Sequence, residues 1–476
     1  TENEKRQSSL HIPHYDIKTM NLRIQINRGL LAALAVSCIV LLPGCTTVRE
    51  ARKVQRDEVP RLPGEYTMPA IDAGIEAGAV LSLSQLEEIA LKCSPSMLQS
   101  SLAVEQARIS LANAKAGYLP TLSSSVGHSR ATRNTDRHSG TTHNNGAYNG
   151  GLNMSLTLYD FGRTSARVRQ AQDSLAAALK EYDQRRSAIV YGVRQAYFEL
   201  RRAIELHAVA VESVGQYSDH LEQMKVKREI GESIEYDVLK AEVDYQSARL
   251  EEISTANSVS TGWANLNLAL GLAETPEYKL GDCNVREYQQ DADELMATAR
   301  EREPSLAALR YNVNVASGAL DESIADLYPD LTFSLGGSVS GRNPALPWLW
   351  NLSSGISLGE NIFNGGRTCN AIRQATISLQ IARSRYAAAE QTMYRDIRSA
   401  VLNSSRAKRS QEVANLKAKS AERNLEITNE KFRNGKATSV DRTDAQVSLS
   451  SAKAQAVNAY FDYLEAQATI AKLIGE

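Results

Sequence analysis

The sequence predicts an α+β chain of 476 residues built from two copies of one unit. Each copy reads as a short helix, two strands, a very long helix and a final helix. Two observations predict this fold. Motifs recur at a near-constant offset, since Pro95 returns 209 positions later as Pro304 and Gly231 returns 204 positions later as Gly435, which indicates an internal duplication. Proline is also absent from two long stretches, 121–275 and 348–476.

The predicted strands lie between the first helix and the long helix of each copy. Residues 151–159 alternate apolar and polar side chains throughout, 331–335 repeat this pattern, and 122–126 and 352–358 are weaker versions. Strands with one polar and one apolar face are typical of a transmembrane β-barrel around a water-filled lumen. A soluble antiparallel sheet with one solvated face predicts the same alternation, so the strands alone leave both interpretations open.

The long helices follow the strands. Glycine and proline are both absent from Arg367 to Asn434, a run of 68 residues rich in helix-favouring side chains. At ~1.5 Å per residue this run predicts a rod of roughly 100 Å. The matching run from Arg163 to Ile230 contains Gly192 and Gly215, which are candidate points of local over- or under-winding. A glycine ends each rod and a last helix completes each copy: Gly231 and then 235–271, Gly435 and then 439–475.

The N-terminal region is typical of an exported lipoprotein. Two arginines after Met20 precede an apolar run from Leu30 to Leu42, which is too short to span a membrane as a helix. The run ends in Leu-Pro-Gly-Cys45, which resembles a bacterial lipobox, so Cys45 is the expected lipidated (palmitate-bearing) residue. Thr46 follows it in place of the Asp that retains lipoproteins at the inner membrane, which implies sorting to the outer membrane. An uncleaved anchor with an incidental cysteine is the alternative, and Met20 is a candidate true start.

Composition and motifs argue against several functional classes. The formal net charge of −1 offers no basic face for nucleic acid. The seven histidines show no metal-binding spacing, and nucleophile-elbow, phosphate-loop and Cys-Xaa-Xaa-Cys motifs are absent. The run 160–162, Asp-Phe-Gly, is interpreted as a strand-to-helix turn. Cys93, Cys283 and Cys369 have no counterparts in the other copy, so a disulfide framework is not expected, although one incidental pair stays open. We therefore expect no catalysis, metal or cofactor.

Together these features resemble the TolC family of bacterial outer-membrane efflux and secretion channels. The resemblance rests on the order of its motifs behind the lipobox: the opening from Leu81 to Ser96, the Tyr/Leu-Pro pairs before the strands, the Gly-Arg pairs before the rods, and the turn 231–241 with its copy 435–445. It implies a homotrimer in which each chain gives four strands to a twelve-stranded transmembrane barrel and its helices to a long periplasmic barrel. Four strands alone would leave open edges in lipid.

The resemblance also implies a function. The protein would be the passive exit duct of a tripartite efflux or type I secretion system, anchored by lipid and spanning the outer membrane. The turns at Gly231 and Gly435 would dock a periplasmic adaptor protein, and an inner-membrane pump of the RND or ABC type would supply energy and choose the cargo. The expected domains are a signal peptide with an N-terminal extension (1–44), an anchor and tether (45–80), a first repeat (81–272), a linker (273–290) and a second repeat (291–476).

The resemblance further implies a constriction at the periplasmic tip. The family narrows its tunnel with carboxylate rings six and nine residues after the second turn glycine, where Asp441 and Asp444 stand here. Asp237 is the first-copy equivalent of Asp441, while Lys240 replaces the second acid. Three chains would thus gather about six carboxylates around one axis. The alternative interpretation is an ordinary solvated helix start, where acids are favoured by the helix dipole.

The family's closed state uses a Tyr and an Arg near the second glycine to tie the tips together. Phe432 and Ala437 stand at those places, and Arg433 and Arg442 are candidate substitutes. Two other classes of protein are alternatives to the channel. A periplasmic coiled-coil scaffold or tether lipoprotein would explain the rods and the anchor but not the strands. An envelope enzyme would need a catalytic constellation that the sequence lacks.

Overall fold

The structure is a computed structural model that describes residues 47–48, 51, 54, 75, 78–134, 142–272, 278–281, 286–288, 291–341 and 349–475. Cys45 and Cys283 lie outside these residues. The chain divides into two units: one holds 1–59, 124–152 and 337–352, and the other holds 60–123, 153–336 and 353–476. Among the described residues, no helix combines the length and apolar character needed to cross a membrane.

Each copy begins with two helices rather than the single short helix that the sequence suggested. In the first copy these are α2 (Leu83–Cys93) and α3 (Pro95–Ala116), and in the second α6 (Ala292–Arg302) and α7 (Pro304–Ala325). Proline lacks an N–H and forces its predecessor out of the helical region, so the helix breaks just before it. Ser94, the residue before Pro95, accordingly has the extended angles φ −68° and ψ 120°.

The two predicted rods are confirmed as unbroken helices of 67 residues each, α4 (Arg163–Glu229) and α8 (Arg367–Arg433). The helix α4 continues through both Gly192 and Gly215. Each rod starts after a left-handed glycine that turns the chain from strand to helix, and Asp160 accepts a hydrogen bond from Thr164 N–H over 2.7 Å in the first of these turns. The final helices are α5 (Glu235–Leu270) and α9 (Ser439–Leu473).

Four strands form one sheet in the order β2-β3-β5-β6. Their bounds are Thr121–Asn134, Thr142–Tyr159, Asp330–Gly341 and Leu349–Gly359. All four predicted strands are present, and each extends beyond the segment that the sequence pattern marked. Within the described part of the chain, the outer strands β2 and β6 each pair on one side. A second sheet of two residues per strand pairs β1 (Val80–Leu81) with β4 (Lys279–Leu280) in parallel.

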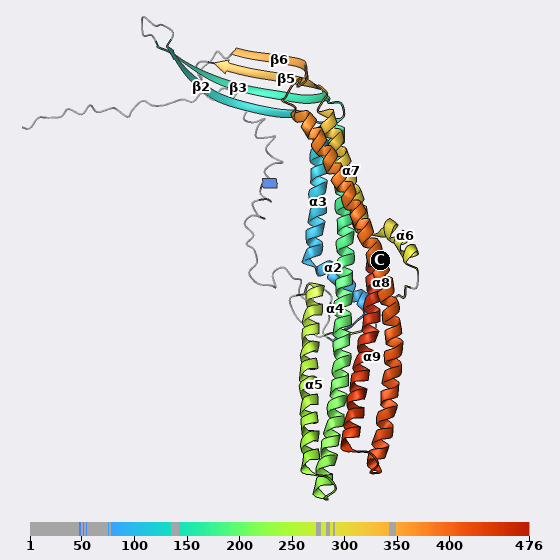
Figure 1. The fold of residues 1–476 in the computed structure, drawn as a ribbon. Coiled ribbons are helices and arrows are strands. Elements are labelled where there is room, and N and C mark those ends of the chain that lie inside the picture. Colours follow the sequence, from blue (N-terminus) through green and yellow to red (C-terminus); the bar gives the residue numbers. More distant parts are fainter. Residues whose placement is uncertain are drawn as a thin grey trace, which may run out of the picture. The chain divides into compact units, whose positions relative to one another are not determined.

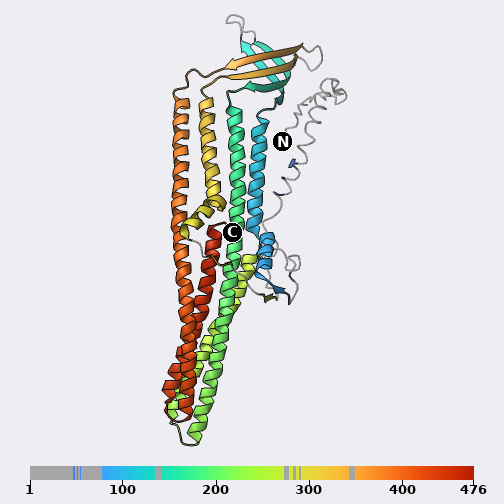
Figure 2. The same cartoon turned by 90° about the vertical axis from the view of Figure 1, so that its right-hand side faces the viewer.

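The rods and final helices pack side by side in the order α5, α4, α9, α8 (Figures 1 and 2). The largest apolar cluster is formed by residues of α2, α4, α5 and α9, and it buries Tyr197, Phe198 and Leu200 of α4 completely. A second apolar cluster joins residues of α6, α8 and α9 around the buried Leu295. Burial of such side chains contributes about 1.5–3 kcal/mol each, which holds the final helices against the rods.

Ion pairs also join the two copies where the rods begin. The Arg163 side chain contacts Asp326 at 2.7 Å and Asp330 at 3.0 Å, so the start of α4 is tied to the C-terminal end of α7 and to the first residue of β5. One turn later, Arg167 pairs with Glu322 at 2.6 Å, and this carboxylate raises the pKa of the Arg167 guanidinium. The start of α4 is therefore fixed against α7 by charge as well as by packing.

Candidate functional site

Two helix-to-helix turns, one in each copy, follow the C-terminal ends of the rods and connect them to the final helices (Figure 2). The first has Gly231 at φ +77° and the second has Gly435 at φ +67°. In both turns the next N–H, that of Glu232 or Lys436, donates to a carbonyl five residues earlier over 2.8 Å. This closure requires a left-handed residue after the helix, which glycine adopts without steric cost. The predicted turn glycines therefore fold as such turns.

Asp441 lies in the first turn of α9, three residues after the helix cap Thr438. Its Oδ2 accepts hydrogen bonds from the Thr438 N–H at 2.8 Å and the Thr438 hydroxyl at 2.7 Å, and its own N–H donates to that hydroxyl at 3.1 Å. These bonds hold the pKa of the Asp441 carboxyl below its usual range. Asp441 therefore belongs to the capping box at the N-terminus of α9. This agrees with the alternative interpretation from the sequence, that of an ordinary helix start.

The other two predicted acids differ from Asp441 in their surroundings. Asp444 is exposed and lies one turn further along α9, on the same face as Asp441. Asp237 is half-buried in the first turn of α5 and accepts a hydrogen bond from the Ser233 hydroxyl over 3.1 Å. Ile234 occupies the cap position of α5, so the first copy lacks the cap that holds Asp441. Within one chain, these carboxylates form no cluster suited to a metal among the described residues.

Arg442 connects the two turns of the chain. Its Nη1 donates to Nδ1 of His220 at 2.7 Å and to Gln223 Oε1 at 2.9 Å on α4, while its Nε donates to Asn429 Oδ1 at 2.9 Å on α8. The guanidinium also lies over the ring of Phe432, 5.6 Å from its centroid, in a cation–π contact. Arg442 of the second copy is therefore held by residues of both copies.

An apolar cluster lies beneath this junction. Phe432 is buried against Leu221 and Met224 of α4 and against Val238 and Ala241 of α5. Burial, with the nearby charges of Arg442 and Lys227, lowers the pKa of His220 to about 4. His220 is therefore neutral at neutral pH. Its Nδ1 can accept from Arg442 while its Nε2–H donates to the Ser439 hydroxyl over 3.0 Å.

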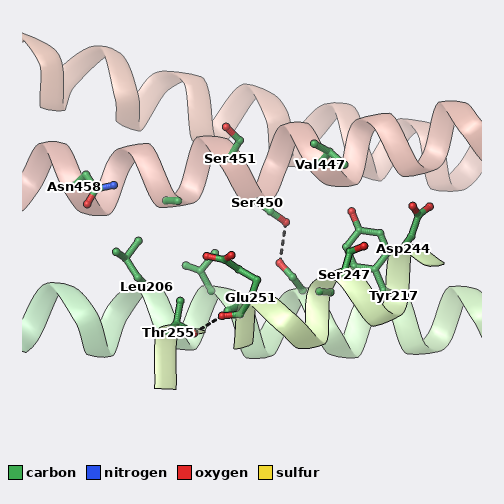
Figure 3. Close-up of a pocket in the computed structure, with 15 residues that line it drawn as sticks. Leu206, Tyr217, Asp244, Ser247, Glu251, Thr255, Val447, Ser450, Ser451 and Asn458 are labelled. Carbon is green, nitrogen blue, oxygen red and sulfur yellow. Dashed lines mark hydrogen bonds between the residues drawn. The ribbon is translucent and has the colours of Figure 1, made fainter. Parts of the chain in front are cut away.

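A groove runs between α5 and α9 above the tip, with α4 as its floor (Figure 3). Ser213 of α4 and Ser450 of α9 are joined by a hydrogen bond of 2.8 Å across it. Asp244 and Glu251 give the α5 side negative charge, and Asp244 Oδ2 is buried with no hydrogen-bond donor among the described residues. Burial and the Asp244 charge raise the pKa of Tyr217 to about 12, so its phenol stays protonated.

The structure therefore brings together some of the predicted residues and adds others. Of the two candidate latch arginines, Arg442 joins the copies, whereas Arg433 is exposed. Sequence reasoning missed His220, because its counterpart 204 positions later is Asn424 and no repeat marks it. It also missed the groove, which depends on the packing of three helices. Cys93 is buried and Cys369 exposed, and no disulfide joins them.

Comparison with known proteins identifies the relatives of this chain. Residues 86–272 and 295–476 match the sequence model of a protein family described as outer membrane efflux protein. The chain is similar to the outer membrane protein TolC of Vibrio cholerae, with 25% identity over 413 residues that cover 83% of this chain and 90% of that protein.

Solved structures show the same fold. One is a membrane protein from Pseudomonas aeruginosa, with a TM-score of 0.74 and 20% identity over 82% of this chain and 93% of that one. Another is the CmeC outer membrane channel of Campylobacter jejuni, with a TM-score of 0.73 and 18% identity over 83% of this chain and 85% of that one. The TM-scores show that this chain shares the fold of these two proteins.

Proposed function

Because this chain belongs to the family of outer membrane efflux proteins, it is a channel protein of the outer membrane, and we propose that three copies form the exit duct of a tripartite efflux or secretion system. The members of this family are channels rather than enzymes. In this duct the pore conducts passively, while a pump in the inner membrane supplies the energy.

The four-stranded sheet is the observation that carries the proposal of a trimer. Among the residues that the structure describes, its outer strands, β2 and β6, have no second partner strand. A sheet in the hydrocarbon core must pair all of its backbone groups, so it has to close into a barrel. Three copies, joined β6 to β2, would close a barrel of twelve strands. The same assembly would place the helices of three chains around one periplasmic tunnel.

We assign the tip of the rods to gating and docking. The turns at Gly231 and Gly435 are exposed and present the ends of two helix pairs to a helical adaptor protein. Asp441 and Asp444 of three chains would give about six carboxylates near the axis, with Asp237 as a further acid, and would favour cations. Arg442 and His220 would hold the two turns together in the resting state.

The N-terminal segment supplies the anchor in this proposal. Residues 1–44 carry the export signal, Cys45 takes the lipid, and the segment to residue 80 tethers it to the first repeat, while 273–290 link 81–272 to 291–476. Metabolic labelling with a palmitate analogue tests this point: label is expected on the full chain and should disappear in Cys45→Ser. Equal labelling of both proteins would contradict the anchor.

The assembly is tested by measuring the mass of the detergent-solubilised complex with native mass spectrometry. Three chains per complex are expected. Trimers should persist in Cys45→Ser, because closure of the sheet and packing of the helices do not require the lipid. A complex that is monomeric or dimeric in several detergents would refute the trimeric duct.

A further inference from the structure

The turns that lead from strand to rod differ between the two copies. The first, 160–162, reads Asp-Phe-Gly, and its counterpart 204 positions later, 364–366, reads Asn-Gly-Gly. In the first turn the carboxylate of Asp160 accepts a hydrogen bond from the Thr164 N–H over 2.7 Å and caps α4. In the second turn a carboxamide, that of Asn364, takes the place of this carboxylate, and glycine follows it directly. The second copy therefore has a reactive pair of residues where the first copy has a stable cap.

An asparagine followed by glycine can lose ammonia with no co-reactant except water. The backbone nitrogen of the glycine attacks the side-chain amide carbon of the asparagine, the new C–N bond closes a succinimide ring, and the side-chain nitrogen leaves as ammonia. Water then opens the ring at either carbonyl, which gives aspartate or isoaspartate. The attack needs a backbone N–H that is free to lose its proton, and it is fastest where the following residue has no side chain to obstruct it.

The chain contains four Asn-Gly pairs, and the structure distinguishes them. The pairs that begin at Asn145 and Asn149 lie in β3, which is paired with β2 on one side and β5 on the other. The pair at the tip begins at Asn434, and there the Gly435 N–H donates to the Phe432 carbonyl over 3.1 Å. The nitrogen that would attack is therefore held by a hydrogen bond at the tip, and the strand pairs belong to a paired, extended backbone.

The fourth pair, Asn364 with Gly365, presents a free nitrogen. Within the part of the chain that the structure describes, the Gly365 N–H donates to no other group. Gly365 is exposed, and a Cβ built on it would meet no atom within 4 Å, so the turn is open around the glycine. The geometry thus separates this pair from the pair at the tip, although both have the same two residues.

Two groups of the turn stabilise the negative charge that develops in the reaction. Arg367 Nε donates to the backbone carbonyl oxygen of Asn364 over 3.2 Å. This oxygen belongs to the peptide group whose nitrogen must lose its proton, so the guanidinium favours the deprotonated form. Thr368 N–H, in the first turn of α8, donates to Asn364 Oδ1 over 3.5 Å, where charge builds up during the attack. The Thr368 hydroxyl accepts from Nδ2 over 2.6 Å and fixes the orientation of the amide.

We propose that Asn364 is a site of spontaneous deamidation, with the Gly365 nitrogen as nucleophile and the Arg367 guanidinium as the group that promotes its deprotonation. The aspartate product reproduces the cap of the first copy, because its carboxylate accepts from Thr368 as Asp160 accepts from Thr164. The isoaspartate product lengthens the backbone by a methylene group and loses this cap. Either product adds a negative charge at the start of α8. This modification does not depend on the function proposed above.

Peptide mapping by mass spectrometry tests the site in the folded, full-length protein, aged in detergent at mildly alkaline pH. Deamidation adds about 1 Da to the peptide that contains Asn364, and isoaspartate is counted separately by labelling with isoaspartyl methyltransferase. Asn364 is expected to react about tenfold faster than Asn434. In protein unfolded in urea the two pairs should react at similar rates, because only the fold distinguishes them. Equal rates at the two pairs in folded protein would overturn the proposal.

Arg367→Gln tests the part assigned to the guanidinium. The rate at Asn364 should fall by about tenfold, while the rate at Asn434 in the same protein should not change. Arg373→Gln is the matched control, because Arg373 is an exposed arginine further along α8 and should leave both rates unchanged. Circular dichroism verifies that each variant is folded. A folded Arg367→Gln protein that deamidates at Asn364 as fast as wild type would refute the role of Arg367.

Discussion

Arg442 of α9 donates a hydrogen bond to Nδ1 of His220 on α4 over 2.7 Å and thereby ties the turn of the second copy to that of the first. The bond requires an unprotonated Nδ1. Burial and the positive charges of Arg442 and Lys227 lower the pKa of His220 to about 4, while Asp237 opposes that effect. The junction at the tip therefore depends on a neutral histidine.

The first prediction concerns pH. An unfolded or opened tip exposes a histidine with a pKa of about 6.5, whereas the closed tip holds it at about 4. The opened state thus binds more protons between these values, and the stability of the closed tip falls as pH falls from about 6.5 to 4. Hydrogen exchange in 216–230, corrected for its intrinsic pH dependence, should report more opening at pH 5 than at pH 7.

His220→Gln supplies the control for this effect, since its amide can still accept from Arg442 and donate to Ser439 but does not titrate. The variant should show little difference in tip exchange between the two pH values. If wild type and variant respond alike, His220 is not the group responsible.

The second prediction concerns Arg442 itself. Arg442→Met keeps most of the side-chain volume but leaves Asn429, His220 and Gln223 without this donor, at a cost of roughly 1–3 kcal/mol to local stability. Exchange at the tip should rise and the thermal midpoint should fall. Arg433→Met is the matched control, because Arg433 is exposed and should change either measurement little. Equal effects of the two substitutions would show that Arg442 is not a specific link.

The third prediction separates the two acids of α9. Asp441→Asn weakens the acceptor of the helix cap, so it should lower stability at neutral pH. Because the pKa of Asp441 is depressed, the stability that it contributes is present above its unfolded pKa and is lost as pH falls below that value. Asp444 lies outside the cap, so Asp444→Asn should leave the thermal midpoint unchanged. A stability loss of the same size in both variants would contradict the assigned cap.

The fourth prediction concerns ion selectivity. If Asp441 and Asp444 line a constriction, changing both to Asn should reduce the preference for cations and weaken block by multivalent cations in bilayer recordings. Asp441→Glu with Asp444→Glu, which keeps the charge, is the control and should retain both properties. Unchanged selectivity in the Asn variant would remove these residues from the gate.

The fifth prediction concerns the turn glycines. Gly231→Ala and Gly435→Ala place a side chain on a left-handed residue, which costs about 1–2 kcal/mol and should weaken adaptor binding if these turns form the docking surface. The matched control is Gly215→Ala, because Gly215 lies within α4 and a Cβ there would meet no atom within 4 Å. That substitution should stabilise the helix by roughly 0.5–1 kcal/mol. Calorimetry and adaptor pull-down on all three variants check this.

The repeat and the glycine and proline positions predicted the fold closely. The rod predicted from Arg163 to Ile230 ends one residue earlier in the structure, at Glu229, because local turn chemistry defines that boundary. The break before Pro95 was missed although proline predicts such breaks, because the helical pattern continues on both sides of it.

The tip was harder to predict. Turn glycines are visible as single residues, but the contact of Arg442 with His220 joins positions 222 apart. Nothing in either segment marks the other as its partner. The groove between α5 and α9 likewise depends on how three helices pack, which no single segment of the sequence predicts. Long-range packing, rather than local propensity, decides such sites.

Single-channel recording in planar bilayers tests whether this chain forms a water-filled channel in the outer membrane. The recording uses purified full-length protein whose insertion is verified by protease protection. Discrete conductance steps that shift toward weaker cation selectivity in the Asp441→Asn, Asp444→Asn protein are the predicted result. Inserted, trimeric protein that passes no current across a range of voltages and pH values would contradict channel formation.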